Sequence, residues 1–272
     1  SHPRHQGQLQ IATAAKRAVG HVAGDAILPP DLPLPGTPGW FHRAGINMSD
    51  YALQRLNMVE SQVRPSDMTD RRVIRAMLAL PRETFVPAEV RPVCYMDRDV
   101  PLSAADEEKA SVPRFLLAPR TQARLVQALE LGDAAIVLDV GCATGYSSAI
   151  LSRIAQTVVA LDEDPQLTAI AAEALAAEEI DNVALVNGRL TDGYDSEGPY
   201  DAILLNGAVA DVPPELLDQL KDGGVLVAVA QVDGVRRAVQ WRRTSGQFAD
   251  RQLFDADAPV LPGFEAKSEF VF

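Results

Sequence analysis

The sequence predicts an α/β fold in which a mostly parallel sheet, with an antiparallel C-terminal edge, follows a helical N-terminal part. Beyond Gly132, short apolar runs alternate with helical stretches, which is typical of a parallel sheet covered by helices on both faces. Before Gly132, apolar residues recur about every 3.6 residues, as on one face of a helix. A hydrophobic content of 47% and a charged content of 23% over 272 residues indicate a globular protein.

Residues 1–47 are expected to form an extension outside this fold, because they show no sustained period. A flexible or expression-derived segment is the main interpretation, and a docking arm is the alternative. The prolines of this segment cluster at Pro29, Pro30, Pro33, Pro35 and Pro38.

Residues 48–132 are expected to be a helical region. Apolar residues from Tyr51 to Val63 predict a first helix, and Thr69 is positioned to cap a second helix that ends before Pro81. Residues 81–119 are irregular and rich in proline. A further helix is expected to follow Pro119 and to end near Gly132.

Residues 133–272 are expected to form the α/β domain. Helices are predicted over 146–154, 165–178 and 213–220, and the pieces 235–244 and 265–272 are expected to complete the sheet as an antiparallel edge. The apolar runs that predict the other strands lie at 135–141, 157–163, 182–188, 200–207 and 223–231.

Charge and residue counts exclude several function classes. The net charge is −12, so binding to a phosphate backbone and hence a nucleic-acid partner are not expected. No apolar run reaches the roughly 18 residues of a membrane span, and a soluble cytoplasmic protein without a membrane partner is the expectation. Cys94 and Cys142 lie far apart, which argues against a disulfide framework or a metal site. All four histidines lie within residues 1–42, so imidazole chemistry is not expected in the rest of the chain.

The loop after the first strand of the predicted sheet, V-L-D-V-G-C-A-T-G-Y, is the candidate ligand site, because ligands of such sheets bind at the carboxyl ends of the strands. Gly141 and Gly145 permit a tight turn, although an ordinary turn remains the alternative. Asp162 ends the next strand, where a carboxylate can accept both hydroxyls of a ribose. Asp139 lies in an apolar strand end, and a cationic ligand would explain this acid.

D-V-G-C-A-T-G followed by Asp162 resembles the S-adenosylmethionine loop of class I methyltransferases. More specifically, residues 54–272 resemble the protein-L-isoaspartate O-methyltransferase family. The matching segments are M-V-E-S-Q-V-R (58–64), V-I-R-A-M (73–77), P-R-E-T-F-V-P (81–87), Tyr95-x-Asp97-Arg98-x-x-x-Leu102, P-Y-D-A-I (199–203) and L-L-D-Q-L-K-D-G-G-V-L-V (216–227).

This resemblance implies a Rossmann-like class I methyltransferase sheet over 133–272, with the helical region 48–132 on the substrate side. It also implies S-adenosylmethionine as the cofactor and a protein or peptide with isoaspartyl residues as the substrate. The cofactor-binding positions that it implies are Asp139, Gly141, Cys142, Ala143, Gly145, Asp162 and Arg189. Cys142 is interpreted as a small space-filling residue rather than a nucleophile.

Three contact regions depart from the family. The family's substrate segment T-I-S-Q-P-Y is F-L-L-A-P-R here, so Leu117 replaces the serine and Arg120 replaces the aromatic residue. Arg189 stands where the family's G-D-G offers an acid to the adenine. The stretch V-T-A-A-P is replaced by residues 205–209, which begin Leu-Asn-Gly.

Methyl transfer to a carboxylate remains compatible with these residues, because a carboxylate with a reference pKa of about 4 is already ionised at neutral pH and needs no general base. Arg98, Arg114 and Arg120 are candidates for orienting that carboxylate through paired hydrogen bonds. Two alternatives stay open. The chain could be a weakly active or non-catalytic relative with a regulatory role, or a methyltransferase for another acceptor.

Overall fold

The computed structural model describes residues 48–102 and 112–266. The predicted extension over 1–47 lies outside the described residues, as does most of the edge piece predicted over 265–272. The described residues all belong to one compact unit. The boundary at residue 132 between a helical region and an α/β domain stays a prediction.

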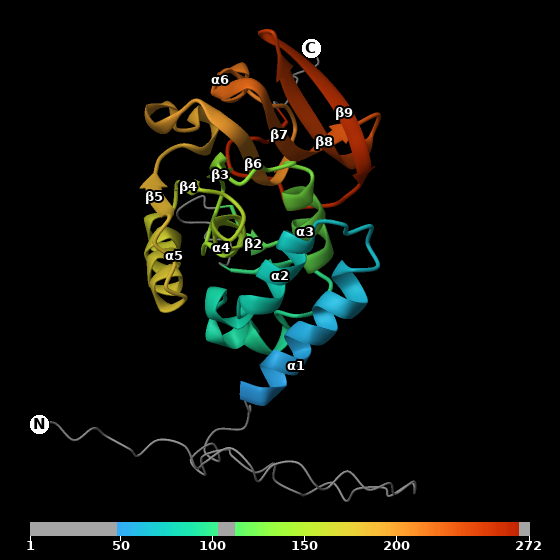
Figure 1. The fold of residues 1–272 in the computed structure, drawn as a ribbon, viewed down its shortest axis with the longest axis vertical. Coiled ribbons are helices and arrows are strands. Elements are labelled where there is room, and N and C mark those ends of the chain that lie inside the picture. The colour runs from blue at the N-terminus through green and yellow to red at the C-terminus, as the bar shows by residue number, and fades with distance from the viewer. Residues whose placement is uncertain (1–47, 103–111, 267–272) are drawn as a thin grey trace, which may run out of the picture. The chain divides into compact units, whose positions relative to one another are not determined.

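A seven-stranded sheet forms the centre of this unit, and it confirms the predicted fold class (Figure 1). Strands β3 to β7 run parallel to one another, β8 is antiparallel to β7, and β9 is antiparallel to β8. In spatial order the strands are β5 (Val183–Asn187), β4 (Thr157–Asp162), β3 (Ile136–Val140), β6 (Tyr200–Val209), β7 (Leu220–Val232), β8 (Val235–Thr244) and β9 (Gln247–Asp255).

The antiparallel edge is present, but its last strand was not anticipated from the sequence. β8 matches the predicted piece 235–244, and it pairs with β9. Residues 247–252 of β9 are all exposed, so this strand carries no apolar run that would mark it. An edge strand with one solvated face does not need such a run.

Helices cover the two faces of the sheet unequally. The side chains of Val137, Val158 and Leu204 face a core that is shared with α3 (Pro119–Gln127), α4 (Tyr146–Ser152) and α5 (Pro165–Ala177). On the other face, Leu138 and Leu205 pack with α6 (Pro214–Asp218) and with the segment around Leu261. Both faces are therefore buried, which explains the nearly continuous apolar runs of the strands.

The N-terminal helices lie on the face of α3 and α4 (Figure 1). α1 (Met48–Met58) continues into a π-helical turn over Val59–Val63, and α2 spans Arg71–Ala79. The prediction of a Thr69 cap was wrong by one residue. Asp70 is the N-cap of α2 and its Oδ1 accepts from Arg72 N at 2.8 Å, while Thr69 N donates to Gln127 Oε1 of α3.

A short antiparallel pair holds the start of segment 115–120, which the family resemblance implies as the substrate segment. β1 (Val100–Pro101) pairs with β2 (Phe115–Leu116), and Leu102 N donates to Arg114 O at 2.8 Å. The backbone of residues 114–116 is thereby fixed beside the sheet.

Arg82, in the segment P-R-E-T-F-V-P, is fully buried and ties this pair to the helical region. Its Nε donates to Cys94 O and its Nη2 donates to Leu117 O, both at 2.6 Å. Its guanidinium also lies 4.8 Å from the ring centre of Tyr146, at the start of α4. Arg82 therefore connects Leu117 of segment 115–120 to Tyr146 of α4, the helix that follows the glycine loop.

We expect Arg82→Met to lower the free energy of unfolding by about 2 to 4 kcal/mol, because two buried carbonyl groups lose their donors. The denaturant midpoint, at an unchanged m-value, measures this loss. Arg71→Met on the exposed face of α2 is the matched control. Equal midpoints for the two variants would contradict the structural role of Arg82.

Candidate active site

The candidate site lies at the carboxyl ends of β3, β4 and β6. β3 is flanked by β4 on one side and by β6 on the other, so the order of the strands reverses here. In an open parallel sheet this is where a crevice forms and where ligands bind. Residues 141–145, Asp162 and Asn206 meet at this edge.

The glycine loop uses its two glycines for different purposes. Both have positive φ, +79° at Gly141 and +90° at Gly145. A Cβ on Gly145 would lie 3.1 Å from Cβ of Ala171, so this glycine permits close packing of the loop on α5. A Cβ on Gly141 would lie 2.8 Å from Leu261 Cδ2 and 3.3 Å from Arg114 Nη2, so this glycine faces the crevice.

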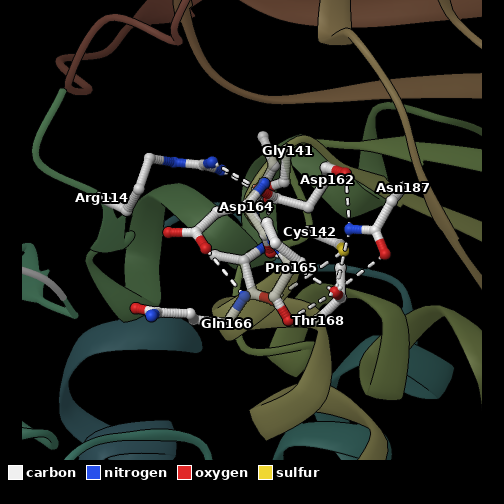
Figure 2. Close-up of polar contacts among 11 residues, drawn as sticks. Arg114, Gly141, Cys142, Asp162, Asp164, Pro165, Gln166, Thr168 and Asn187 are labelled. Carbon is white, nitrogen blue, oxygen red and sulfur yellow. Dashed lines mark hydrogen bonds and ion pairs between the residues drawn. The ribbon is translucent and has the colours of Figure 1, made fainter. Parts of the chain in front are cut away.

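Asp162 is fully buried at the end of β4, and its carboxylate receives four hydrogen bonds. Ala143 N donates to Oδ2 at 2.7 Å and Asp164 N donates to Oδ1 at 3.1 Å. Arg114 supplies the other two, from Nη1 to Oδ1 and from Nη2 to Oδ2, each at 2.8 Å (Figure 2). This is the bidentate geometry in which a guanidinium binds a carboxylate most strongly.

Asp139 is also fully buried, at the end of β3. Its Oδ2 accepts hydrogen bonds from the hydroxyls of Ser147 and Ser148 of α4, both at 2.6 Å. Its Oδ1 has no partner among the residues that the structure describes. Burial raises the pKa of Asp139 to about 6, and the two serine hydroxyls partly offset this rise.

Asn206 joins the site from β6, and sequence reasoning did not assign it a role. Its Nδ2 donates to Ser147 Oγ at 3.2 Å and to Gly141 O at 3.4 Å. Its Oδ1 has no partner within the described ranges. A single polar residue inside the apolar run of a strand end was the signal that could have indicated it.

Residues 259–261, called the C-terminal segment below, cover the crevice. Ala208 N donates to Pro259 O at 2.8 Å and Leu261 N donates to Ala208 O at 2.9 Å, so this segment runs beside the end of β6. The side chain of Leu261 lies over Gly141 and Gly207, and a Cβ on Gly207 would lie 2.7 Å from Leu261 Cγ. The absence of a side chain at Gly207 therefore makes room for this cover.

The remaining cavity has about 10 Å³, which is roughly the room for one water molecule. It is lined by Pro113, Arg114, Phe115, Leu117, Asn206, Pro259, Val260 and Leu261. Pockets for small molecules and cofactors have about 300 to 1,000 Å³. The donor and acceptor groups around Asp162 suit a ribose, but a nucleoside can enter only when Arg114 or Leu261 moves.

The two predicted substrate positions lie in different surroundings. Leu117 is 1% exposed and lines the cavity. The Arg120 side chain is 55% exposed and pairs with Asp97 at 3.1 Å. Arg98 is exposed as well, so among the three candidate arginines it is Arg114 that reaches the crevice.

Two of the other predicted cofactor positions, Cys142 and Arg189, differ in exposure. Cys142 is buried, and burial raises the pKa of its thiol well above the usual value, which agrees with a space-filling role. Arg189 is exposed at the start of the turn Leu190–Asp192 that follows β5. The described ranges contain no cluster of His, Cys, Asp and Glu side chains that could hold a metal ion. No helix within them is long and apolar enough to cross a membrane.

The chain matches a known protein family over most of its length. The family model of protein-L-isoaspartate(D-aspartate) O-methyltransferase matches residues 54–255. The chain is 30% identical over 225 residues to a protein-L-isoaspartate O-methyltransferase of Koribacter versatilis, covering 83% of this chain and 98% of the relative. It is 35% identical over 175 residues to one of Methanoculleus marisnigri, covering 64% of this chain and 76% of the relative.

Solved structures show the same fold. A protein-L-isoaspartate O-methyltransferase aligns with a TM-score of 0.67 at 22% identity, over 77% of this chain and 66% of that one. A Plasmodium falciparum chain, described as a beta-aspartate methyltransferase in complex with S-adenosyl-L-homocysteine, aligns with a TM-score of 0.62 at 20% identity, over 78% of this chain and 97% of that one.

The raised pKa of Asp139 predicts a pH-dependent effect of Asp139→Asn on stability. Between the reference pKa of about 4 and the native value of about 6, the native state holds a proton that the unfolded chain releases. The contribution of Asp139 to the free energy of unfolding is therefore fully present below pH 4 and is lost as the pH rises through 6. The free energy of unfolding of the variant minus that of wild type should therefore be about 2 to 3 kcal/mol more favourable to the variant at pH 7.5 than at pH 4.

Urea unfolding of both proteins at the two pH values measures this effect. Asp181→Asn, at an exposed position, is the control and should show no comparable change. If the difference between Asp139→Asn and wild type were the same at both pH values, the buried carboxylate would not titrate as described.

Proposed function

The chain belongs to the protein-L-isoaspartate(D-aspartate) O-methyltransferase family, and from this premise we propose that its acceptor is the free carboxylate of an isoaspartyl residue in a protein or peptide. It is an S-adenosylmethionine-dependent methyltransferase. The observation that carries the acceptor proposal is that the substrate segment of the family, here residues 115–120, borders the crevice at the glycine loop through Leu117. Damaged proteins are the substrate class that follows.

S-adenosylmethionine, when bound, supplies a methyl group on a positively charged sulfur. In our proposal Asp162 holds the ribose hydroxyls, and residues 141–143 line the cofactor, with Asp139 beneath them. Gly145 supports this loop through its contact with α5. The family correspondence assigns Arg189 to the adenine side in this proposal, and its exposure leaves it room to contact the ring.

The acceptor carboxylate is the nucleophile, and at neutral pH it carries its charge without a base. This chain therefore has to hold the acceptor carboxylate in line with the methyl group and to keep water out of the site. Holding the reacting atoms in line contributes roughly 7 to 11 kcal/mol in favourable cases. The apolar side chains of Leu117 and Leu261 border the cavity and offer water no hydrogen bond there.

A second candidate function is a weakly active relative that binds the cofactor in a regulatory role. It is supported by Leu117, which replaces the family's serine and offers no hydrogen-bond donor beside the cavity. It is also supported by the hydrogen bonds that already fill Asp162.

Methyl transfer from labelled S-adenosylmethionine to an isoaspartyl peptide, compared with its aspartyl isomer, tests the proposal. We expect slow but isomer-selective transfer by the wild type. Leu117→Ser should accelerate it by up to about 100-fold, because a hydroxyl near the reacting oxygen stabilises the transition state. The control is Leu117→Ala, which opens the same space without a hydroxyl.

Equal rates for the serine and alanine variants would contradict the role of the hydroxyl at this position. Absence of transfer in all three proteins, together with measurable cofactor binding, would reject the isoaspartyl acceptor and favour the second candidate.

A further inference from the structure

The ion pair between Arg114 and Asp162 occupies the place where the proposed function requires the cofactor. The carboxylate already has two donors on each oxygen, and two of the four come from the guanidinium. A ribose can use these oxygens only after Arg114 has left them. The inference below rests on the proposed function in this respect.

The departure of Arg114 involves its side chain and not its backbone. The carbonyl of Arg114 is held by Leu102 N, and the next two residues pair with β1. The small cavity borders the arginine on the side of Leu117 and Asn206. A long, flexible side chain on a fixed backbone can therefore turn from Asp162 toward this cavity.

The cavity has the composition of a site for one charged group in apolar surroundings. Of the eight residues that line it, only Arg114 and Asn206 carry polar side chains. Arg114 is 6% exposed in the ion pair, and an anion at the cavity would stabilise a buried guanidinium that has left Asp162. The acceptor carboxylate is an anion of the same geometry, and Leu117 supplies no competing donor.

We propose that Arg114 exchanges one carboxylate for another: it closes the cofactor crevice on Asp162 and, once the cofactor takes Asp162, it binds the acceptor carboxylate beside Asn206. Arg114 is then both a gate for the cofactor and a specificity residue for the acceptor. The family's serine donor is replaced in this role by a guanidinium that comes from three residues earlier in the chain.

This exchange fixes an order of binding. The cofactor enters first, because the acceptor has no free guanidinium to bind before Asp162 is taken. Linkage also requires that an acceptor carboxylate on Arg114 tightens cofactor binding by the same factor by which the cofactor tightens acceptor binding. An isoaspartyl peptide should therefore increase the affinity for the cofactor product.

Calorimetry with S-adenosylhomocysteine tests the exchange without turnover. Arg114→Met cannot form the ion pair, so we expect its affinity for S-adenosylhomocysteine to rise about 10- to 100-fold over wild type. The isoaspartyl peptide should tighten S-adenosylhomocysteine binding to wild type and should leave the variant unaffected. Arg71→Met, on the exposed face of α2, should behave as wild type in both titrations.

Arg114→Lys serves as the second variant if Arg114→Met does not fold. A lysine keeps the charge but cannot make the bidentate contact, so the gain in affinity should be smaller, and the peptide effect should be reduced. A purely structural role for Arg114 predicts the opposite sign, with weaker binding of S-adenosylhomocysteine in both variants. Unchanged or weaker binding of S-adenosylhomocysteine to the variants would therefore contradict the proposal that Arg114 gates the cofactor crevice.

Failure of the exchange and failure of the proposed function give different results. If the acceptor is not an isoaspartyl residue, Arg114→Met still binds S-adenosylhomocysteine more tightly, but the peptide has no effect on wild type, which overturns the acceptor half of the proposal. If isoaspartyl transfer is robust and Arg114→Met gains no affinity, the proposed function stands and the exchange is wrong.

Discussion

The buried pair of Arg114 and Asp162 is the interaction on which the state of the active site depends. Two charges with almost no exposure are stable in a protein interior only when each has a partner of matching geometry. Asp162 has that partner in Arg114 and in two backbone amides. Any ligand that takes this carboxylate must therefore replace a guanidinium, and any change that removes the guanidinium leaves a buried charge.

The rest of the fold holds this pair in place from two directions. The sheet brings Asp162 beside the glycine loop, because β3 and β4 are adjacent and parallel and their carboxyl ends coincide. The pairing of β1 with β2 brings Arg114 to the crevice from the helical region, and Arg82 connects that region to Leu117 and to α4. The C-terminal segment then closes the crevice with Leu261, which requires glycine at positions 141 and 207.

Sequence patterns predicted those parts of the fold that depend on local burial. The parallel strands are buried on both faces and therefore appear in the sequence as apolar runs, whose ends locate the glycine loop and Asp162. β9 could not be predicted in this way, because its exposed residues leave no periodic trace. Arg114 was one of three equivalent arginine candidates, and only the tertiary structure separates it from the exposed Arg98 and Arg120. Asn206 left a local signal, a polar residue inside an apolar run, but its hydrogen bond to Ser147 depends on the tertiary structure. Leu261 acquires its role from long-range contacts that no local pattern encodes.

A crystal structure of the protein with S-adenosylhomocysteine bound is the most direct test of the central claim that the cofactor displaces Arg114 from Asp162. The account predicts that the ribose hydroxyls lie within hydrogen-bond distance of the Asp162 carboxylate and that the Arg114 guanidinium has turned toward Leu117 and Asn206. A bound S-adenosylhomocysteine beside an intact pair of Arg114 and Asp162 would contradict it.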